Sequence, residues 1–282
     1  MRRPNLFILG APRCGTTAMF EFLGEHPDIY PSRIKEPKFF LSEDERAPGP
    51  EGERSLSGYL HLFVGATDQR WLLEASTGYL WSPDAARRIR EFTPDARAVV
   101  MVRDPVEQIR SLHAHRVFLR WHRSLDLLAD IDEDGAFYWK RVCSGKNLRR
   151  VLETFSRDDV HTIVYDDFAA SNKSEYRRVL EFLGVDPSFT PHFQAVNASF
   201  SPRSQAIQQA LWGGRGVLRA ITRVVLPEKV RKRGFSVASL LNRRSPRPLD
   251  PDVTKGLWQQ LEADVELLSS LLGRDLVSLW RR

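Results

Sequence analysis

The chain has few cysteines and no long hydrophobic run. Its two cysteines, Cys14 and Cys143, lie far apart without a C-x-x-C pair, which argues against a disulfide framework or a zinc site and favours a reducing compartment. No apolar run approaches the roughly 20 residues that span a bilayer. The first apolar run, residues 6–9, is shorter than the about 7 to 15 residues of a signal-peptide core. We therefore expect a cytoplasmic protein.

Positive charge is concentrated in one segment. Residues 215–247 hold ten basic residues and one acidic residue, so this basic segment carries +9 in a chain of 282 residues whose total is +6. The rest of the chain is slightly acidic, at −3, and we expect no specific nucleic-acid partner. Such a run is most often a solvated helix face. Its functional alternatives are binding to an anionic acceptor such as a polysaccharide, peripheral contact with an acidic lipid surface, or binding to a partner protein.

Short β-rich apolar runs alternate with helical patterns along the chain. Strands are expected at residues 6–9, 71–73, 98–102 and 161–165. The alternation predicts an α/β fold, a P-loop-like parallel sheet flanked by helices with a helical C-terminal extension. We expect a single domain over 1–282, made of an α/β core (1–205), a basic helical segment (206–248) and a C-terminal helix (249–282). Residues 42–58 are expected to form a mobile loop.

A glycine-bounded loop follows the first predicted strand. Residues 10–17 read Gly-Ala-Pro-Arg-Cys-Gly-Thr-Thr, which matches G-x-x-x-x-G-K-[ST] except that Thr16 replaces the Lys. The glycines let backbone N–H groups approach an anion, and the following helix adds partial positive charge. Arg13 supplies a full charge that can grip phosphate, and Thr16 and Thr17 add hydroxyl donors. The loop therefore predicts phosphate binding without the lysine of a magnesium-dependent triphosphatase.

A second set of polar residues follows the third predicted strand. Arg103 stands at the carboxyl end of that strand, where open α/β sheets bind ligands. Asp104 and Pro105 suit the cap and first position of a helix. Ser111 and His115 are four residues apart on that helix and share one face. This set predicts a second phosphate site.

Together the two segments resemble the two cofactor motifs of sulfotransferases that use 3′-phosphoadenosine 5′-phosphosulfate (PAPS), especially those of bacterial and heparan-sulfate type. The similarity extends over residues 23–40, 74–79 and 165–187 and the C-terminal helix, and so includes most of the chain. It implies a PAPS site without a metal, with 3′,5′-ADP as the product. The implied 5′-phosphosulfate residues are Pro12, Arg13, Cys14, Gly15, Thr16 and Thr17, and the implied 3′-phosphate residues are Arg103 and Ser111.

The same resemblance implies roles for three further residues. Glu36, in the sequence Lys-Glu-Pro-Lys-Phe-Phe, falls on the carboxylate that deprotonates the acceptor, although Lys38 replaces the usual His. His115 matches a histidine implicated near the transferred group in N-sulfotransferases. Arg203 matches a late phosphate contact of bacterial members.

The resemblance implies in-line transfer of a sulfuryl group from PAPS to a hydroxyl, or an amine, of a carbohydrate or other small molecule. Arg13, Glu36 and His115 are then the catalytic residues. Two alternatives remain open. One is a P-loop nucleotide kinase or triphosphatase that uses ATP and magnesium. Thr16 in place of Lys and the predicted second phosphate site at Arg103 and Ser111 argue against it. The other is a non-catalytic anion-binding protein that uses the basic segment.

Overall fold

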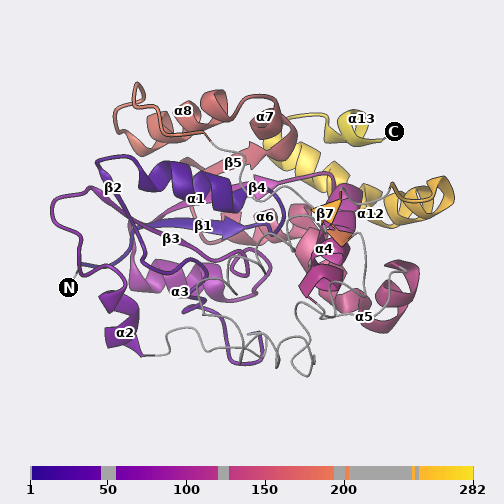
Figure 1. The fold of residues 1–282 in the computed structure, drawn as a ribbon, viewed down its shortest axis with the longest axis horizontal. Helices are drawn as coiled ribbons and strands as arrows, with labels where there is room; N and C mark the ends of the chain where they lie inside the picture. Colours follow the sequence, from indigo (N-terminus) through magenta and orange to yellow (C-terminus); the bar gives the residue numbers. More distant parts are fainter. Residues whose placement is uncertain are drawn as a thin grey trace, which may run out of the picture.

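A five-stranded sheet in the order β2-β3-β1-β4-β5 lies at the centre of the fold (Figure 1). Every neighbouring pair of its strands is parallel. The strands are β1 (Leu6–Gly10), β2 (Ile29–Pro31), β3 (Trp71–Ala75), β4 (Arg97–Val102) and β5 (Val160–Val164). The predicted parallel α/β fold and its four predicted strands are confirmed. Strand β2 was not predicted, because three residues are too few to show a periodic pattern.

Helices cover both faces of the sheet. Figure 1 shows α1 and α8 on one side and α3 on the other. The helices are α1 (Thr16–Gly24), α2 (Leu56–His61), α3 (Ala85–Phe92), α4 (Pro105–Leu119), α5 (Leu127–Val142), α6 (Ser144–Leu152), α7 (Tyr165–Ala170), α8 (Asn172–Leu183), α12 (Pro251–Leu272) and α13 (Leu276–Trp280), with a 3-10 turn η1 (Arg157–Asp159). Strands β6 (Ser201–Pro202) and β7 (Arg243–Arg244) form a separate antiparallel pair. The predicted C-terminal helix is present as α12 and ends at Gly273, whose φ is 63°.

The computed structural model describes residues 2–45, 55–119, 127–193, 201–202, 243–244 and 248–281. Arg203 and, apart from residues 243–244, the basic segment lie outside these ranges. The predicted loop over 42–58 is wrong at its end, because α2 begins at Leu56. Ser55 Oγ accepts a hydrogen bond from Gly58 N at 3.1 Å, so a serine cap starts this helix. Among the described residues, no helix is long and apolar enough to cross a membrane.

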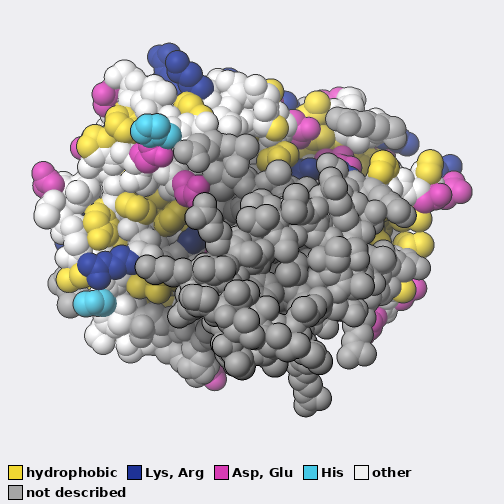
Figure 2. Space-filling model, in the orientation of Figure 1, with side chains coloured by type: hydrophobic (Ala, Val, Ile, Leu, Met, Phe, Trp, Pro, Cys, Tyr) yellow, Lys and Arg dark blue, Asp and Glu magenta, His cyan; other side chains and the backbone are white. Residues whose placement is uncertain are grey.

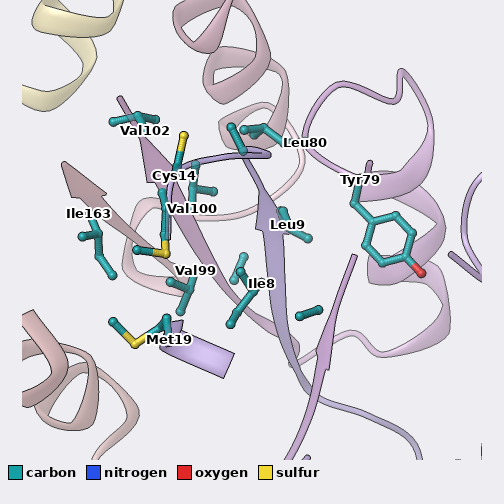
Figure 3. Close-up of a cluster of buried hydrophobic side chains, with 14 of the residues drawn as sticks. Ile8, Leu9, Cys14, Met19, Tyr79, Leu80, Val99, Val100, Val102 and Ile163 are labelled. Carbon is teal, nitrogen blue, oxygen red and sulfur yellow. The ribbon is translucent and has the colours of Figure 1, made fainter. Parts of the chain in front are cut away.

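The core lies against the central strands. Strands β1 and β3 are buried along their whole length, as expected where helices cover both faces of a parallel sheet. Figure 3 shows part of this core, to which Cys14 of the loop after β1 contributes. Burial raises the pKa of the Cys14 thiol to about 12, so Cys14 acts as an apolar packing residue. On the described part of the face in Figure 2, acidic and basic side chains are interspersed.

Helix α6 lies in close contact with α12 at Gly145. A Cβ atom on Gly145 would lie 2.3 Å from Asp264 O and 3.0 Å from Leu268 N. Gly145 N also donates to Asp264 Oδ2 at 2.8 Å. We expect Gly145→Ala to lower the free energy of unfolding by about 2–3 kcal/mol, because the helices must separate to admit a methyl group. Urea unfolding of the full chain measures this change.

The matched control for Gly145→Ala is Gly256→Ala in α12. No atom lies within 4 Å of a Cβ atom placed on Gly256, so this change is expected to raise the free energy of unfolding by about 0.5–1 kcal/mol through helix propensity. Equal effects of the two substitutions would contradict the steric explanation.

Candidate active site

The loop between β1 and α1 places a helix N-terminus at the carboxyl edge of the sheet. Gly15 is the N-cap residue of α1, with a φ of 91°. A Cβ atom there would lie 2.9 Å from the Phe168 ring, so both conformation and space require glycine. As the N-cap residue, Gly15 has no side chain that could accept a hydrogen bond from the first turn of α1. Backbone N–H groups at such a helix N-terminus are suited to bind an anion.

The beginning of the same loop lies against the turn that follows β3. Leu80 N donates to Leu9 O at 2.8 Å. A Cβ atom on Gly10 would lie only 2.9 Å from Thr77 O. The loop and the turn after β3 are therefore in direct contact, and any group held by this turn lies close to the loop.

Two guanidinium groups converge beside the loop. Arg13 Nε donates to Ser111 Oγ at 3.0 Å, and Arg103 Nη1 donates to Arg13 O at 3.1 Å. Arg103 also lies 4.4 Å from the centroid of the Tyr165 ring and 3.6 Å from Glu107 Oε2. Burial and the neighbouring charge of Arg103 lower the pKa of Arg13. Because two cations held this close repel each other, the arrangement favours binding of an anion.

Gln108 of α4 connects the loop after β1 to α5, and it was not among the residues predicted from the sequence. Its side chain is fully buried, and Nε2 donates to Pro12 O at 2.9 Å and to Arg141 O at 3.2 Å. The available signal was its position three residues before Ser111, on the same face of α4. Gln108 positions the main chain of the loop.

His115 lies on α4, one turn beyond Ser111. Burial, and then the charge of Arg13, lower the pKa of His115 to about 4. The imidazole is therefore neutral at pH 7. It can donate one ring N–H to an anion but adds no positive charge to the site.

Glu36 is held by the turn after β3. Thr77 N and Thr77 Oγ1 donate to its carboxylate at 3.1 Å and 3.0 Å, and Lys35 Nζ pairs with it at 2.9 Å. Glu36 N donates to Ala75 O at 2.9 Å. Because Thr77 holds Glu36 and its carbonyl oxygen lies against Gly10, a single residue separates the carboxylate from the loop after β1. The Glu36 side chain is 29% exposed, so solvent or a substrate can reach it.

The structure thus places five predicted site residues at one edge of the sheet: Arg13, Glu36, Arg103, Ser111 and His115. Within the loop, the Cys14 side chain points into the core, and Thr16 is buried as well. Thr77, which holds Glu36, was not identified from the sequence. No group of three or more His, Cys, Asp or Glu residues that could hold a metal ion occurs among the residues described.

A cavity of about 460 Å³ lies outside this arrangement, between α4, α12 and α13. It is lined by Asp104, Glu107 and Arg110 at the start of α4 and by neither Arg13 nor Glu36, and it adjoins the site through Glu107, whose Oε2 lies 3.6 Å from Arg103. The chemistry therefore places the candidate site at the sheet edge and not in this cavity.

A family model described as "Sulfotransferase family" matches residues 54–191. Human heparan sulfate glucosamine 3-O-sulfotransferase 6 is 34% identical over 113 residues, which are 40% of this chain and 30% of that protein. Human bifunctional heparan sulfate N-deacetylase/N-sulfotransferase 1 is 30% identical over 122 residues, or 41% and 13% of the two chains. The chain therefore spans less than a third of the length of these two curated relatives.

Among solved structures, a sulfotransferase from Alicyclobacillus acidocaldarius is similar over 100% of both chains, with a TM-score of 0.75 and 26% sequence identity. This similarity includes the loop at 10–17 and Glu36, which precede the segment matched by the family model. Arg103, Ser111 and His115 lie inside that segment.

Proposed function

The chain belongs to the sulfotransferase family, and from this premise we propose that it transfers a sulfuryl group from PAPS to an acceptor hydroxyl or amine by in-line displacement. The observation that carries the proposal is the convergence of Arg13 and Arg103 beside the N-terminus of α1. PAPS has phosphate groups at its 5′ and 3′ positions, and two adjoining cationic positions suit such a donor. We assign residues 1–282 to one domain.

The residues assigned to PAPS binding supply hydrogen-bond donors, which phosphate oxygens require. In the loop of residues 12–17, the backbone N–H groups of residues 13–17, the two threonine hydroxyls and the Arg13 guanidinium donate hydrogen bonds to the 5′-phosphosulfate, and Pro12 lines this position without a donor of its own. Arg103 and Ser111 hold the 3′-phosphate. The hydrogen bond from Arg13 Nε to Ser111 Oγ joins the two phosphate positions, so each fixes the other. Arg203 is assigned to the 3′-phosphate on sequence similarity alone.

In this reaction, each side chain at the carboxyl edge of the sheet has a separate role. Glu36 accepts the proton of the acceptor as its oxygen or nitrogen bonds to sulfur and the bond from sulfur to the leaving phosphate oxygen breaks. Arg13 and the first-turn N–H groups of α1 stabilise the charge that develops on that leaving oxygen. His115 donates a hydrogen bond beside it. We assign no metal, because these cations and dipoles occupy the place that magnesium has in phosphoryl transfer.

The acceptor is a carbohydrate or another small molecule. Both curated relatives carry names that specify heparan sulfate sulfotransferases, which supports a saccharide acceptor here. Glu36 at 29% exposure leaves room for a hydroxyl or amine to approach.

Titration calorimetry tests the donor assignment. We expect 3′,5′-ADP to bind in preference to ATP with magnesium. Ser111→Ala removes the partner of Arg13 Nε and one donor to the 3′-phosphate, so it should weaken 3′,5′-ADP binding by about 10-fold, as for the loss of a hydrogen bond to a charged group. Binding of 5′-AMP, which lacks the 3′-phosphate, should change less.

The control is Ser57→Ala, at an exposed position of α2, which should leave both affinities unchanged. Preferential binding of ATP with magnesium would overturn the donor assignment and support the kinase alternative.

A further inference from the structure

A carboxylate lies buried beside the segment that carries Glu36. Glu74, on β3, is 0% exposed, and its Oε2 accepts hydrogen bonds from Tyr59 OH at 2.7 Å and from Tyr79 OH at 3.0 Å. Its Oε1 has no hydrogen-bond partner, and no cation in the described part of the chain forms an ion pair with it. Burying a carboxylate in this way costs stability, so its contacts need a functional explanation.

Both tyrosines connect Glu74 to residues 36–41. Tyr79 OH accepts a hydrogen bond from Phe40 N at 3.2 Å. The Tyr59 ring stacks on Phe39, with 4.1 Å between the ring centroids and 4° between the planes. Glu74 thus holds two side chains, each of which contacts the segment directly after Glu36.

The backbone of this segment needs support. Glu36 and Lys38 both adopt positive φ, at 64° and 57°, a conformation that costs energy for residues other than glycine. Each residue is hydrogen-bonded to the end of β3. Glu36 N donates to Ala75 O at 2.9 Å, and Lys38 N donates to Ser76 Oγ at 3.0 Å. The orientation of Glu36 therefore depends on contacts from β3 and from the residues that Glu74 holds.

We propose that Glu74 is a positioning residue for Glu36: its ionised carboxylate holds Tyr59 and Tyr79, and these hold the segment in the conformation that presents Glu36. The proposal rests on the proposed role of Glu36 as the proton acceptor. A charged acceptor makes stronger hydrogen bonds to the two hydroxyls than a neutral carboxylic acid does.

The surroundings of Glu74 place its change between the protonated and the ionised form near neutral pH. Burial raises the pKa of Glu74 to about 7, with a further upward effect from the charge of Glu36. Hydrogen bonds from Tyr59 of α2 and Tyr79 of the turn, together with the nearby Ser76 hydroxyl, oppose that rise. Because Glu74 is protonated below pH 7 and ionised above it, the segment is held more firmly as the pH rises from 6 to 8.

Hydrogen exchange of the Phe40 amide in the full chain tests this directly. After correction for intrinsic exchange, protection of Phe40 N–H is expected to rise by about 5–10-fold between pH 6 and pH 8, the difference between a charged and a neutral acceptor in the network. Glu74→Gln should make protection independent of pH. Glu91→Gln, at an exposed position of α3, should leave the wild-type behaviour intact. A pH dependence that survives Glu74→Gln, or none in the wild type, overturns the proposal.

Tyr79→Phe keeps the test decisive if Glu74→Gln does not fold. It leaves Glu74 in place but removes the hydroxyl that joins Glu74 to Phe40 N, so protection of Phe40 should again lose its pH dependence. Retention of that dependence in Tyr79→Phe contradicts the proposed link.

Sulfate transfer separates this proposal from the proposed function. With labelled PAPS and an extract of the host as the acceptor, the rate for Glu74→Gln should fall by about 10-fold with no change in the Kd of 3′,5′-ADP, and its pH profile should lose the step near pH 7. An unchanged pH profile in the variant counts against Glu74. If the wild type transfers no sulfate, the proposed function fails, and the exchange of Phe40 still decides the role of Glu74.

Discussion

Replacing Arg13 with Ala is expected to remove both donor binding and sulfate transfer. Its guanidinium is hydrogen-bonded to Ser111 Oγ and lies beside Arg103 and the N-terminus of α1, so it serves both phosphate positions. We expect the Kd of 3′,5′-ADP to rise by about 10²-fold, and the rate to fall by about 10³-fold because the leaving oxygen loses its nearest charge. Calorimetry and labelled-sulfate transfer measure the two effects.

Arg13→Lys distinguishes charge from geometry at this position. Lys keeps the positive charge but cannot hold phosphate with a planar fork, so it should recover part of the binding and little of the rate. Arg87→Ala, on the exposed side of α3, is the control and should change neither. If Arg13→Ala still binds 3′,5′-ADP as tightly as the wild type, the alternative of an anion-binding protein that uses the basic segment is favoured.

The cationic half of the site could be predicted from the sequence because it follows local rules. Glycine spacing at 10–17 predicted the loop, and the rule that ligands bind at the carboxyl ends of parallel strands predicted the place of Arg103. Helical periodicity correctly put Ser111 and His115 on one face of α4. The hydrogen bond from Arg13 to Ser111 then joins residues 98 positions apart, which follows only once β1 and β4 are known to be neighbours.

The supporting residues could not be predicted, because their partners are distant in sequence. Gln108 holds Pro12 O from 96 positions away, and Thr77 holds Glu36 from 41. Neither contact leaves a periodic signal. Glu74 stands in an apolar run whose pattern predicts a strand but does not indicate that a carboxylate is buried there. Strand β2 and helix α2 are likewise short elements, stabilised by contacts with the rest of the fold.

Replacing Glu36 with Gln is expected to remove sulfate transfer while leaving donor binding in place. Gln has nearly the same size and still offers an oxygen to Thr77 N, but it cannot accept a proton at neutral pH. The rate should fall by about 10³-fold, within the range for loss of a general base. The Kd of 3′,5′-ADP should change by less than about 2-fold, because the phosphate positions are formed by other residues.

The comparison of Glu36→Gln with Glu36→Asp shows whether the rate of sulfate transfer falls because the group that accepts the acceptor's proton is missing. Asp retains a carboxylate one methylene shorter, so it should transfer sulfate more slowly than the wild type but faster than Gln. Full activity of Glu36→Gln would mean that another group accepts the proton. Loss of 3′,5′-ADP binding along with activity would mean that the turn after β3 has been disturbed.

A protein that only bound anions could not separate loss of sulfate transfer from loss of 3′,5′-ADP binding, since binding would be its whole function. Loss of transfer with retained binding in Glu36→Gln, beside loss of both in Arg13→Ala, therefore requires a catalyst.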